Sequence, residues 1–375
     1  MAGTQRVLCY AKGLIAAGAE VQVVIPCTTE RGKPRNTELT GCYEGVPFKY
    51  LTKTTVSNSF RRIFMIGDIF DDICYYWPFC ITKIKKNDKV FFYGLARHRM
   101  AIRILHIRGI KTAHELCEFP GLGRKNLYFR YEKWSALKIW FRKYDGIVAI
   151  SENLYNLAEH FKKSSAKIIK IPILVEDNKE DVSEKPLYSV PYIIHTGTMN
   201  ENKDGISYIL KAFANYKKND KKGCRLIFTG PDAVPNCPYI PLMEKLGIRN
   251  FVDLKGLVDR KVLYNLQHYA SASIIYKVVN TQTKYCFATK TGEVLIQGVP
   301  VITTSVGEAK NYIIDGNNGF IVEAGNINQL SEKIEYIIDN PDKAICVGQE
   351  GRKLAIEHFN YLKHGKRLKS FLESL

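Results

Sequence analysis

The sequence lacks the patterns that mark several common classes of protein. Its ten cysteines form no C-x-x-C pair and no close cluster with histidine, so we expect no zinc site and interpret them as reduced thiols of a cytoplasmic protein. No signal-peptide pattern is recognisable, and no apolar run reaches the roughly 20 residues of a membrane-spanning helix, because Asp68, Asp71 and Asp72 interrupt the best candidate at 64–84. No G-x-G-x-x-G loop with a later acidic residue is present, which argues against a nicotinamide-dependent oxidoreductase.

Acidic residues are scarce relative to basic ones. The chain has 55 Lys and Arg against 37 Asp and Glu, a formal net charge of +18, and 83–143 alone holds 16 basic and 4 acidic residues. Such a field attracts nucleic acid, anionic lipid headgroups or a phosphorylated substrate, although the charge also serves solubility alone. Without a recognisable nucleic-acid-binding module, we expect no nucleic-acid partner. An anionic membrane surface stays a candidate partner, with the aromatic run 75–79 either contacting it or packing in the core.

Segments with strand and helix patterns alternate along the chain. This alternation predicts an α/β fold with parallel sheets covered by helices on both faces, arranged as two Rossmann-like, doubly wound domains that face a central cleft. Ligands of such sheets bind at the carboxyl ends of the strands. The strand-like runs are 21–26, 89–93, 146–150, 167–172, 192–195, 225–229, 252–254, 273–276 and 300–303.

A charged stretch without periodicity, 175–189, predicts the boundary between the two domains. We expect an N-terminal Rossmann-like domain at 1–174 and a C-terminal Rossmann-like domain at 190–357. A C-terminal helix at 358–375 is expected to pack back on the first domain. Residues 1–4 run almost directly into a helical pattern, so the first sheet is expected to lack its usual first strand.

One segment with the chemistry of a phosphate site is 194–205, where a strand delivers the small-residue loop Thr196-Gly197-Thr198 and Lys203 precedes the next helix. Small residues let the backbone approach a ligand, helix N-termini favour anions, and lysine supplies a positive charge. The alternative is an ordinary turn with a solvated lysine.

A more specific segment is 280–302, where a polar loop leads into a helix that carries Lys290 and Glu293 in its first turns. Glu293 is placed to accept the two hydroxyls of a ribose, and the amides of the helix start suit a phosphate. The alternative is a glutamate that only complements the helix dipole.

The stretch 287–302, Phe-Ala-Thr-Lys-Thr-Gly-Glu-Val-Leu-Ile-Gln-Gly-Val-Pro-Val-Ile, resembles the donor-binding signature of family 4 glycosyltransferases. These are retaining enzymes of the GT-B fold. The segment ending in Lys203-Asp204-Gly205 is similar to their phosphate loop, 145–151 to the last strand and serine of their N-terminal domain, and 317–322 to their strand after the donor helix. The resemblance covers nearly the whole chain in order.

This resemblance implies roles for individual residues. Lys203 and Lys290 would contact the donor diphosphate and take part in catalysis, together with an active-site histidine or acid at His114 and Glu115, unless 114–120 is merely a solvated loop. The implied donor-binding residues are Gly197, Thr198, Lys203, Gly230, Thr289, Lys290 and Glu293. The implied acceptor-side loop residues are Gly3, Thr4 and Glu118.

Three departures from the family pattern stand out. Tyr285 occupies the place of the first glutamate of the family's E-x7-E motif, and Thr198 that of an arginine common after the phosphate-loop glycine. The third is the missing first strand. We interpret Tyr285 as the mark of a subgroup. The departures keep a second reading open, in which the chain is a non-catalytic or truncated GT-B paralogue that binds a nucleotide-sugar.

The resemblance implies sugar transfer from a nucleotide-diphosphate donor to a glycan or a lipid-diphosphate-linked acceptor, with retention of the anomeric configuration, in the synthesis of cell-surface polysaccharide or glycoconjugate. It implies no cofactor and no metal, because lysines and helix-end amides would neutralise the leaving diphosphate. The expected location is the cytoplasm, with the inner face of the membrane as a candidate peripheral site.

Overall fold

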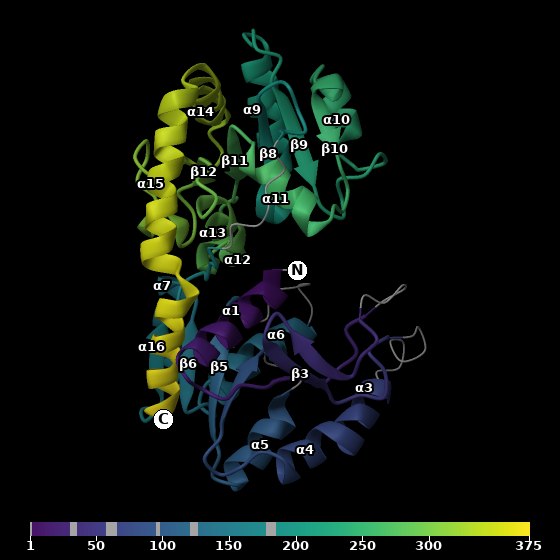
Figure 1. Ribbon diagram of the computed structural model, residues 1–375, viewed down its shortest axis with the longest axis vertical. Helices are drawn as coiled ribbons and strands as arrows, with labels where there is room; N and C mark the ends of the chain where they lie inside the picture. The colour runs from purple at the N-terminus through teal and green to yellow at the C-terminus, as the bar shows by residue number, and fades with distance from the viewer. Residues whose placement is uncertain (1, 31–35, 58–65, 95–97, 121–126, 178–184) are drawn as a thin grey trace. The chain divides into compact units, whose positions relative to one another are not determined.

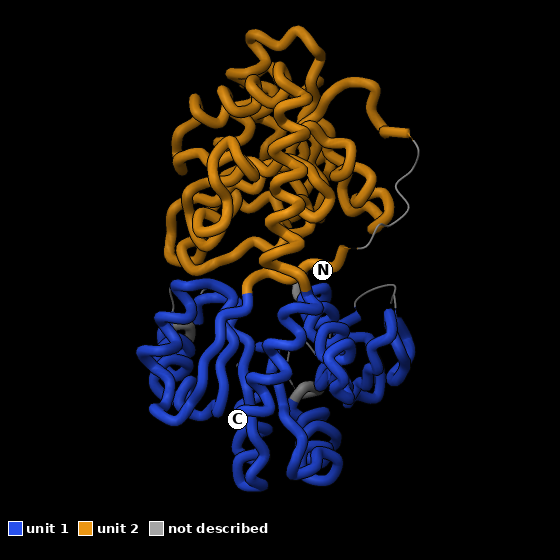
Figure 2. Tube along the Cα trace, turned by 60° about the vertical axis from the view of Figure 1, so that its left-hand side comes forward, with its two compact units in different colours: residues 1–171, 361–375 blue, residues 172–360 orange. Residues whose placement is uncertain are grey.

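The computed structural model describes residues 2–30, 36–57, 66–94, 98–120, 127–177 and 185–375. The chain divides into two compact units (Figure 2): unit 1 comprises 1–171 and 361–375, and unit 2 comprises 172–360. The C-terminal helix α16 (Tyr361–Glu373) is therefore part of unit 1 although it follows unit 2 in the sequence.

Unit 1 contains two separate sheets in its described part. The first is a parallel sheet in the order β4-β5-β6-β7, and the second has the order β1-β3-β2, with β2 antiparallel to β3. Among the described residues, no strand belongs to both sheets. The strands are β1 (Val23–Ile25), β2 (Thr40–Tyr43), β3 (Val46–Tyr50), β4 (Lys89–Tyr93), β5 (Lys111–Leu116), β6 (Gly146–Ala149) and β7 (Lys167–Lys170).

Helix α1 (Ala2–Ala16) joins both sheets of unit 1 to the C-terminal helix. Leu8 and Ala11 pack with Val46 of β3, and the ring of Tyr10 meets Phe91 of β4 edge-on at 5.2 Å. On its other side α1 lies against α16 (Figure 1), and the two backbones approach each other closely at a pair of glycines. A Cβ atom on Gly365 would stand 2.2 Å from the carbonyl oxygen of Gly13, so neither position has room for a side chain.

The remaining helices of unit 1 cover its sheets. Two of the helical runs contain a π-helical turn, at η1 and at η3. The elements are α3 (Ile66–Asp71), η1 (Asp72–Tyr76), α4 (Trp77–Thr82), α5 (Arg99–Ile107), α6 (Leu127–Ser135), η3 (Ala136–Trp140) and α7 (Glu152–Phe161).

Unit 2 is built on one six-stranded parallel sheet in the order β10-β9-β8-β11-β12-β13 (Figure 1). All residues of the central strands β8 and β11 are buried, as expected for a parallel sheet covered on both faces. The β strands are β8 (Tyr192–Thr196), β9 (Arg225–Thr229), β10 (Val252–Leu254), β11 (Ala272–Ile275), β12 (Val301–Thr304) and β13 (Phe320–Val322).

The helices of unit 2 follow the strands in the alternation that the sequence predicts. Amphipathic faces drive their packing: Ile206, Ile209 and Phe213 of α9 lie in the core, and α14 packs beside α9. The helices are α8 (Glu201–Asp204), α9 (Ile206–Lys217), α10 (Ile240–Lys245), α11 (Arg260–His268), α12 (Thr281–Tyr285), α13 (Thr289–Leu295), α14 (Ile327–Asp339) and α15 (Pro341–Phe359), with short 3₁₀ turns η4 (Arg249–Phe251) and η5 (Ala309–Asn311).

The first part of the predicted linker belongs to the folded part of unit 2. Val175 is buried and its amide donates to the carbonyl of Phe359 at 2.8 Å. Asp177 accepts two hydrogen bonds of 2.8 Å from Arg352. Residues 178–184 of the predicted linker lie outside the described residues. The unit boundaries fall after Ile171 and after Asn360.

Candidate active site

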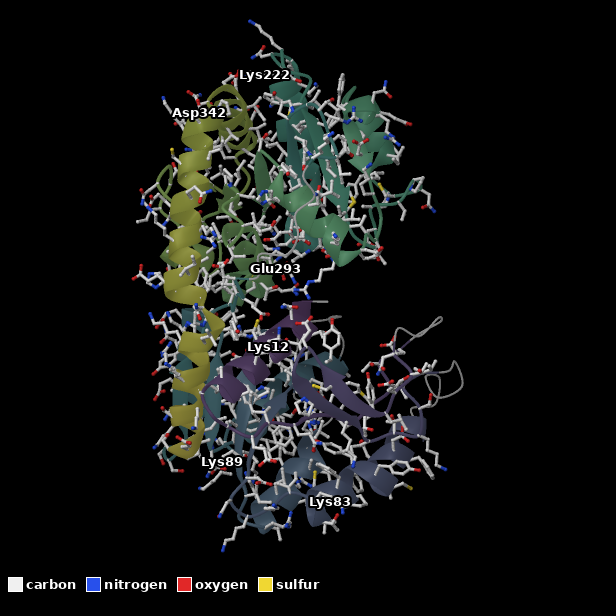
Figure 3. All side chains as sticks on the ribbon, in the orientation of Figure 1. Lys12, Lys83, Lys89, Lys222, Glu293 and Asp342 are labelled. Atoms are coloured by element: carbon white, nitrogen blue, oxygen red, sulfur yellow. The ribbon has the colours of Figure 1, made fainter. Side chains whose placement is uncertain are left out.

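The predicted donor residues of unit 2 gather at the carboxyl ends of β8 and β11, the two central strands of its sheet. Strand β8 ends at Thr196 and leads through Gly197 into the short helix α8, which carries Lys203. Strand β11 leads to Lys277, and α13 brings Lys290 and Glu293 to the same place. Figure 3 labels Glu293 on α13. The parallel topology thus collects residues that are up to 97 positions apart in the sequence, from Thr196 to Glu293.

The amine of Lys290 lies across the loop after β8. It donates a hydrogen bond to the carbonyl oxygen of Thr196, and a Cβ atom on Gly197 would stand 1.5 Å from Nζ. Gly197 also has a φ of +117°, which L side chains rarely adopt. Gly230 closes the other side, because a Cβ there would stand 2.0 Å from the carbonyl oxygen of Gly197. The two glycines therefore make room for the amine and for the packing of one loop on the other.

The pKa values of Lys290 and Glu293 reflect the charged groups that lie near them. Burial lowers the pKa of Lys290 to about 8; Glu293 and Asp204 raise it, and Lys277 and Lys203 lower it. Burial also raises the pKa of the Glu293 carboxyl, and the charge of Lys290 opposes that rise. Three amines and two carboxylates thus share one partly desolvated place.

Lys277 is the member of this cluster that the sequence reasoning missed. Its amine forms an ion pair with Asp204, and both residues are buried, at 7 % and 5 % exposure. The hydroxyl of Thr198 donates to the other oxygen of Asp204 at 3.4 Å, and Thr304 accepts from the amide of Lys277 at 3.1 Å. The signal in the sequence was a lysine directly after the strand-like run 273–276. Because a strand end next to β8 is where ligands bind, that position could have been included.

The charge of the cluster favours an anion. Asp204 neutralises Lys277, so Lys203 and Lys290 are set against the single carboxylate of Glu293. Thr289, the first residue of α13, lies partly exposed beside Lys290, and Thr198 is exposed in the loop. An arrangement of two amines with hydroxyls and loop amides can bind a phosphate or diphosphate, and Glu293 can accept hydrogen bonds from hydroxyls one turn further along α13.

Residues around this cluster hold its loops in place. Asn280 and Thr283 form a capping box at the start of α12, and the Asn280 side chain donates to the carbonyl of Asn202 in α8. Tyr285 is the last residue of α12 and is partly buried. The α12 start is thereby tied to the segment that carries Lys203.

The predicted residues of unit 1 lie on β5, where neighbouring side chains point to opposite faces of the sheet. His114 is 3 % exposed, stacks on the ring of Tyr144 at 4.7 Å between centroids, and has its pKa lowered to about 3 by burial. Glu115 is 1 % exposed and accepts hydrogen bonds from Arg6 at 2.7 Å and from Tyr10 at 2.8 Å. Burial raises the pKa of this carboxyl, and the Arg6 guanidinium opposes the rise. Both predicted catalytic groups are therefore engaged within the core of unit 1.

The predicted acceptor-side loop is different in the structure. The backbone of Gly3 and Thr4 lies in the first turn of α1, which begins at Ala2, so these residues form a helix rather than a loop. The periodic apolar positions of α1 carry the helix through them, because a glycine and a threonine are tolerated in a first turn. Glu118 is exposed just after β5, in the position that the sequence predicts for a loop residue.

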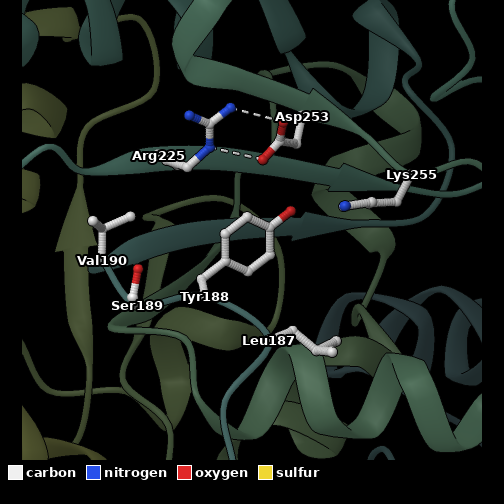
Figure 4. Close-up of a pocket in the computed structure, with 7 residues that line it drawn as sticks. All are labelled: Leu187, Tyr188, Ser189, Val190, Arg225, Asp253 and Lys255. Carbon is white, nitrogen blue, oxygen red and sulfur yellow. Dashed lines mark hydrogen bonds and ion pairs between the residues drawn. The ribbon is translucent and has the colours of Figure 1, made fainter.

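A separate cavity of about 470 Å³ lies on unit 2, away from the lysine cluster (Figure 4). Arg225 and Asp253 form a two-pronged ion pair in it, with both distances 2.8 Å, and Lys255 lies over the ring of Tyr188 at 5.2 Å. Val190 and Arg225 belong to the amino-end side of β8 and β9, the opposite end from Thr196 and Gly197. The cavity is lined by Leu187, Tyr188, Ser189, Val190, Arg225, Asp253 and Lys255.

No group of three or more His, Cys, Asp and Glu side chains in the described part of the chain is placed to hold a metal ion. None of the helices formed by those residues is both long and apolar enough to cross a membrane.

The fold defines a class: two Rossmann-like α/β units make up a GT-B fold, and solved structures share it. Sucrose-phosphate synthase of Thermosynechococcus elongatus is similar with a TM-score of 0.72 at 14 % identity, covering 98 % of this chain and 93 % of that one. Anabaena HepE in complex with UDP is similar with a TM-score of 0.65 at 13 % identity, covering 88 % and 87 %.

The sequence is also similar to known glycosyltransferases. Residues 190–340 match the family model described as glycosyl transferases group 1. EpsD of Bacillus subtilis (strain 168), whose assignment as a glycosyltransferase is itself provisional, is 26 % identical over 277 residues, which are 69 % of this chain and 68 % of EpsD. The capsular polysaccharide biosynthesis glycosyltransferase CapM of Staphylococcus aureus is 40 % identical over 62 residues, 16 % of each chain. Residues 190–340 are thus similar in sequence to glycosyltransferases, and the chain shares the GT-B fold of the solved structures.

Proposed function

We propose that this protein transfers a sugar from a nucleotide-diphosphate donor, bound on unit 2 at the ends of β8 and β11, to a glycan or lipid-diphosphate-linked acceptor. The observation that carries the proposal is the position of the Lys290 amine on the loop at Gly197, with Lys203 and Glu293 close enough for their charges to shift its pKa. Two amines at the carboxyl ends of central parallel strands suit a diphosphate, and a nearby carboxylate suits a ribose.

The comparisons support a uridine nucleotide as the first donor to test. HepE of Anabaena, a structure with the same fold, was solved in complex with UDP and with UDP-glucose. The name of CapM supports a role in capsular or other cell-surface polysaccharide synthesis. We therefore place UDP-sugars first among donors, and a growing glycan or lipid-linked sugar first among acceptors.

The chemistry of the transfer follows from where charge develops. As the bond between the sugar and the diphosphate breaks, the sugar becomes an oxocarbenium-like cation and the diphosphate gains negative charge. A hydroxyl of the acceptor forms the new bond to the anomeric carbon, and its proton leaves with the diphosphate. Lys203 and Lys290, fixed before the reaction by the β8 loop and α13, stabilise that charge without a metal or a cofactor. The loop around the diphosphate has its close packing from Gly197 and Gly230, and its hydroxyl groups come from Thr198 and Thr289. The resemblance to family 4 enzymes supports retention of the anomeric configuration.

The acceptor side is assigned to unit 1. Glu118, exposed after β5, is the residue that we assign to acceptor contact. His114 and Glu115 act as positioning residues for this strand end, because their side chains are occupied by Tyr144 and by Arg6 and Tyr10.

The test combines binding and turnover. Thermal unfolding of the full chain is followed with UDP-, GDP-, ADP- and CMP-linked sugars, since a ligand of the native state raises the melting temperature. Donor hydrolysis and transfer are then measured for the wild type and for Lys290→Ala, with the exposed Lys211→Ala of α9 as the matched control. We expect turnover of Lys290→Ala to fall by roughly tens- to a thousand-fold while Lys211→Ala stays like the wild type.

Two results would contradict the proposal. Full activity of Lys290→Ala would remove the amine from the mechanism. Binding of a nucleotide-sugar without hydrolysis or transfer to any acceptor would favour the alternative, a non-catalytic GT-B paralogue, for which the tyrosine at position 285 is the supporting observation.

A further inference from the structure

The outer face of α6 in unit 1 exposes large apolar side chains. Leu127, Tyr131 and Trp134 are 78 %, 53 % and 53 % exposed. Their spacing of four and three residues puts them on one face of the helix, and the rings of Tyr131 and Trp134 lie 6.0 Å apart. Large aromatic side chains are normally mostly buried, so a row of them on a surface helix indicates a contact surface.

Among the described residues of unit 1, it is the opposite face of the same helical run that packs in the core. Ser135, Ala136, Leu137 and Trp140 are buried there. The guanidinium of Arg99 lies over the ring of Trp140 at 5.3 Å and also donates to Ser135 at 3.0 Å. The inner face of this helical run is therefore apolar. Its outer face carries both apolar and charged side chains.

The charge around the outer face has one sign. Arg130, on the same face as Leu127 and Trp134, is exposed, and so are Lys138 and Arg142 on the following turns. The acidic residue of α6, Glu132, is drawn to the inner side by an ion pair of 2.8 Å with Arg99. Among the described residues of 127–143, five cations accompany this one acid: Arg130, Lys133, Lys138, Arg142 and Lys143.

We propose that the outer face of α6 and of the turns that follow it, formed by Leu127, Arg130, Tyr131, Trp134, Lys138 and Arg142, docks unit 1 on an anionic lipid surface. Tyrosine and tryptophan rings with a polar tip are stable at the boundary between headgroups and acyl chains. Lysine and arginine beside them are attracted to anionic headgroups. Charge complementarity favours an anionic lipid surface over a neutral glycan. A neutral glycan could stack on the aromatic rings, but it has no negative charge for the lysine and arginine side chains to bind.

Helix α6 packs on the segment of unit 1 that we assign to acceptor contact, so docking through α6 would bring that segment to the membrane. The ammonium of Lys133 lies over the ring of Phe119 at 4.9 Å, so α6 packs on the segment that leaves the carboxyl end of β5. That segment carries Glu118, which we assign to the acceptor. A membrane under α6 would hold this edge of unit 1 near a lipid-linked acceptor; this part of the inference rests on the proposed function.

The experiment is sedimentation of the full chain with vesicles of phosphatidylcholine alone or with phosphatidylglycerol at a ratio of ~2:1. One variant removes three cations, Arg130→Gln/Lys138→Gln/Arg142→Gln. A second removes the aromatic rings, Tyr131→Ser/Trp134→Ser. We expect salt-sensitive binding of the wild type to the anionic vesicles only. The first variant should bind on the order of 100-fold more weakly, since each cation contributes a factor of about five, and the second about 10-fold more weakly.

Matched controls come from unit 2. Lys211→Gln/Lys245→Gln/Lys343→Gln removes the same charge from exposed positions, and Ile314→Ser/Ile345→Ser removes apolar side chains that are 61 % and 56 % exposed. Both controls should bind like the wild type. Circular dichroism and melting temperature check that every variant is folded.

Three outcomes would overturn the inference: no binding of the wild type to anionic vesicles, equal losses in the α6 and control variants, or an α6 ring variant that loses binding only to a soluble oligosaccharide. Donor hydrolysis, measured without lipid, should be the same in the α6 variants and the wild type. Vesicle binding by a chain that hydrolyses no donor would refute the proposed function alone, and hydrolysis without vesicle binding would refute the docking alone.

Discussion

The amine of Lys290 fills the space that a side chain at Gly197 would need. It donates a hydrogen bond to the carbonyl of Thr196, and a Cβ atom at position 197 would stand 1.5 Å from this amine. The glycine loop of β8 is therefore shaped around a cation of the protein itself. This relationship makes the loop, the amine and α13 a single unit, so a change in one of them should be felt by the others.

Gly197→Ala should abolish donor binding, because the new methyl group must displace the amine of Lys290 and the backbone must keep a φ of +117°. The backbone strain should lower the free energy of unfolding by about 1–3 kcal/mol. Calorimetric titration with UDP and urea unfolding measure the two effects. If Gly197→Ala binds UDP as tightly as the wild type, donor binding does not require the Lys290 amine to lie beside position 197.

The pH dependence of donor binding should follow Lys290. Burial lowers its pKa from 10.5 to about 8 in the folded protein, so the amine is protonated at pH 7 and loses its proton as the pH rises through 8. Donor affinity should therefore fall between about pH 7 and 9. In the window from 8 to 10.5 the unfolded chain binds more protons than the folded one, so the unfavourable contribution of this group to stability disappears as the pH rises.

Calorimetric titrations across this pH range test the assignment with two variants. Lys290→Arg keeps its charge and should show a flatter profile, whereas Lys290→Met should bind weakly at every pH. A wild-type affinity that does not change from pH 7 to 9 would contradict the role given to the amine.

Lys277→Met should destabilise unit 2 by about 3–5 kcal/mol, since it leaves the buried carboxylate of Asp204 without its partner. Lys277→Met/Asp204→Leu removes both charges and should recover much of this loss. Urea unfolding of the single and double variants measures the coupling. Equal stabilities of the wild type and the single variant would show that the pair does not hold the site together.

The crossing of α1 and α16 should tolerate no side chain at its centre. Gly365→Ala places a methyl group 2.2 Å from the carbonyl oxygen of Gly13, so the helices must separate, and we expect a loss of about 1–3 kcal/mol in the unfolding free energy of unit 1. The exposed neighbour Lys366→Ala serves as the control and should change stability little. A Gly365→Ala variant as stable as this control would mean that the two helices can move apart freely.

Transfer should proceed without a metal, because the amines of Lys203 and Lys290 supply the positive charge that a divalent cation gives other phosphate sites. Turnover measured with and without a chelator should agree within error. A loss of activity on chelation that added Mg²⁺ or Mn²⁺ restores would assign part of that charge to a metal.

The sequence predicted the parts of the structure that depend on local pattern. The alternation of strands and helices in unit 2 follows from the periodic patterns of the sequence. Lys203, Lys290 and Glu293 were candidates because they lie near predicted strand ends and helix starts and because the resemblance to family 4 enzymes implies their roles. Lys277 was missed because only the neighbouring position of β8 and β11 in the sheet shows that its amine reaches the same place.

The surroundings of Glu115 could not be predicted, since its partner Arg6 is 109 residues away and the burial of both depends on how α1 packs on β5. The same packing decides that Gly3 and Thr4 belong to a helix. Spacing identifies candidate groups, whereas tertiary contacts decide whether a carboxyl is open to a substrate or held in the core.

The most direct test of the central claim is a crystal structure of the protein with UDP. The account predicts that oxygens of the diphosphate lie within hydrogen-bond distance of the amines of Lys203 and Lys290, with the ribose hydroxyls on Glu293. A nucleotide bound elsewhere, with both amines turned away from it, would contradict the account.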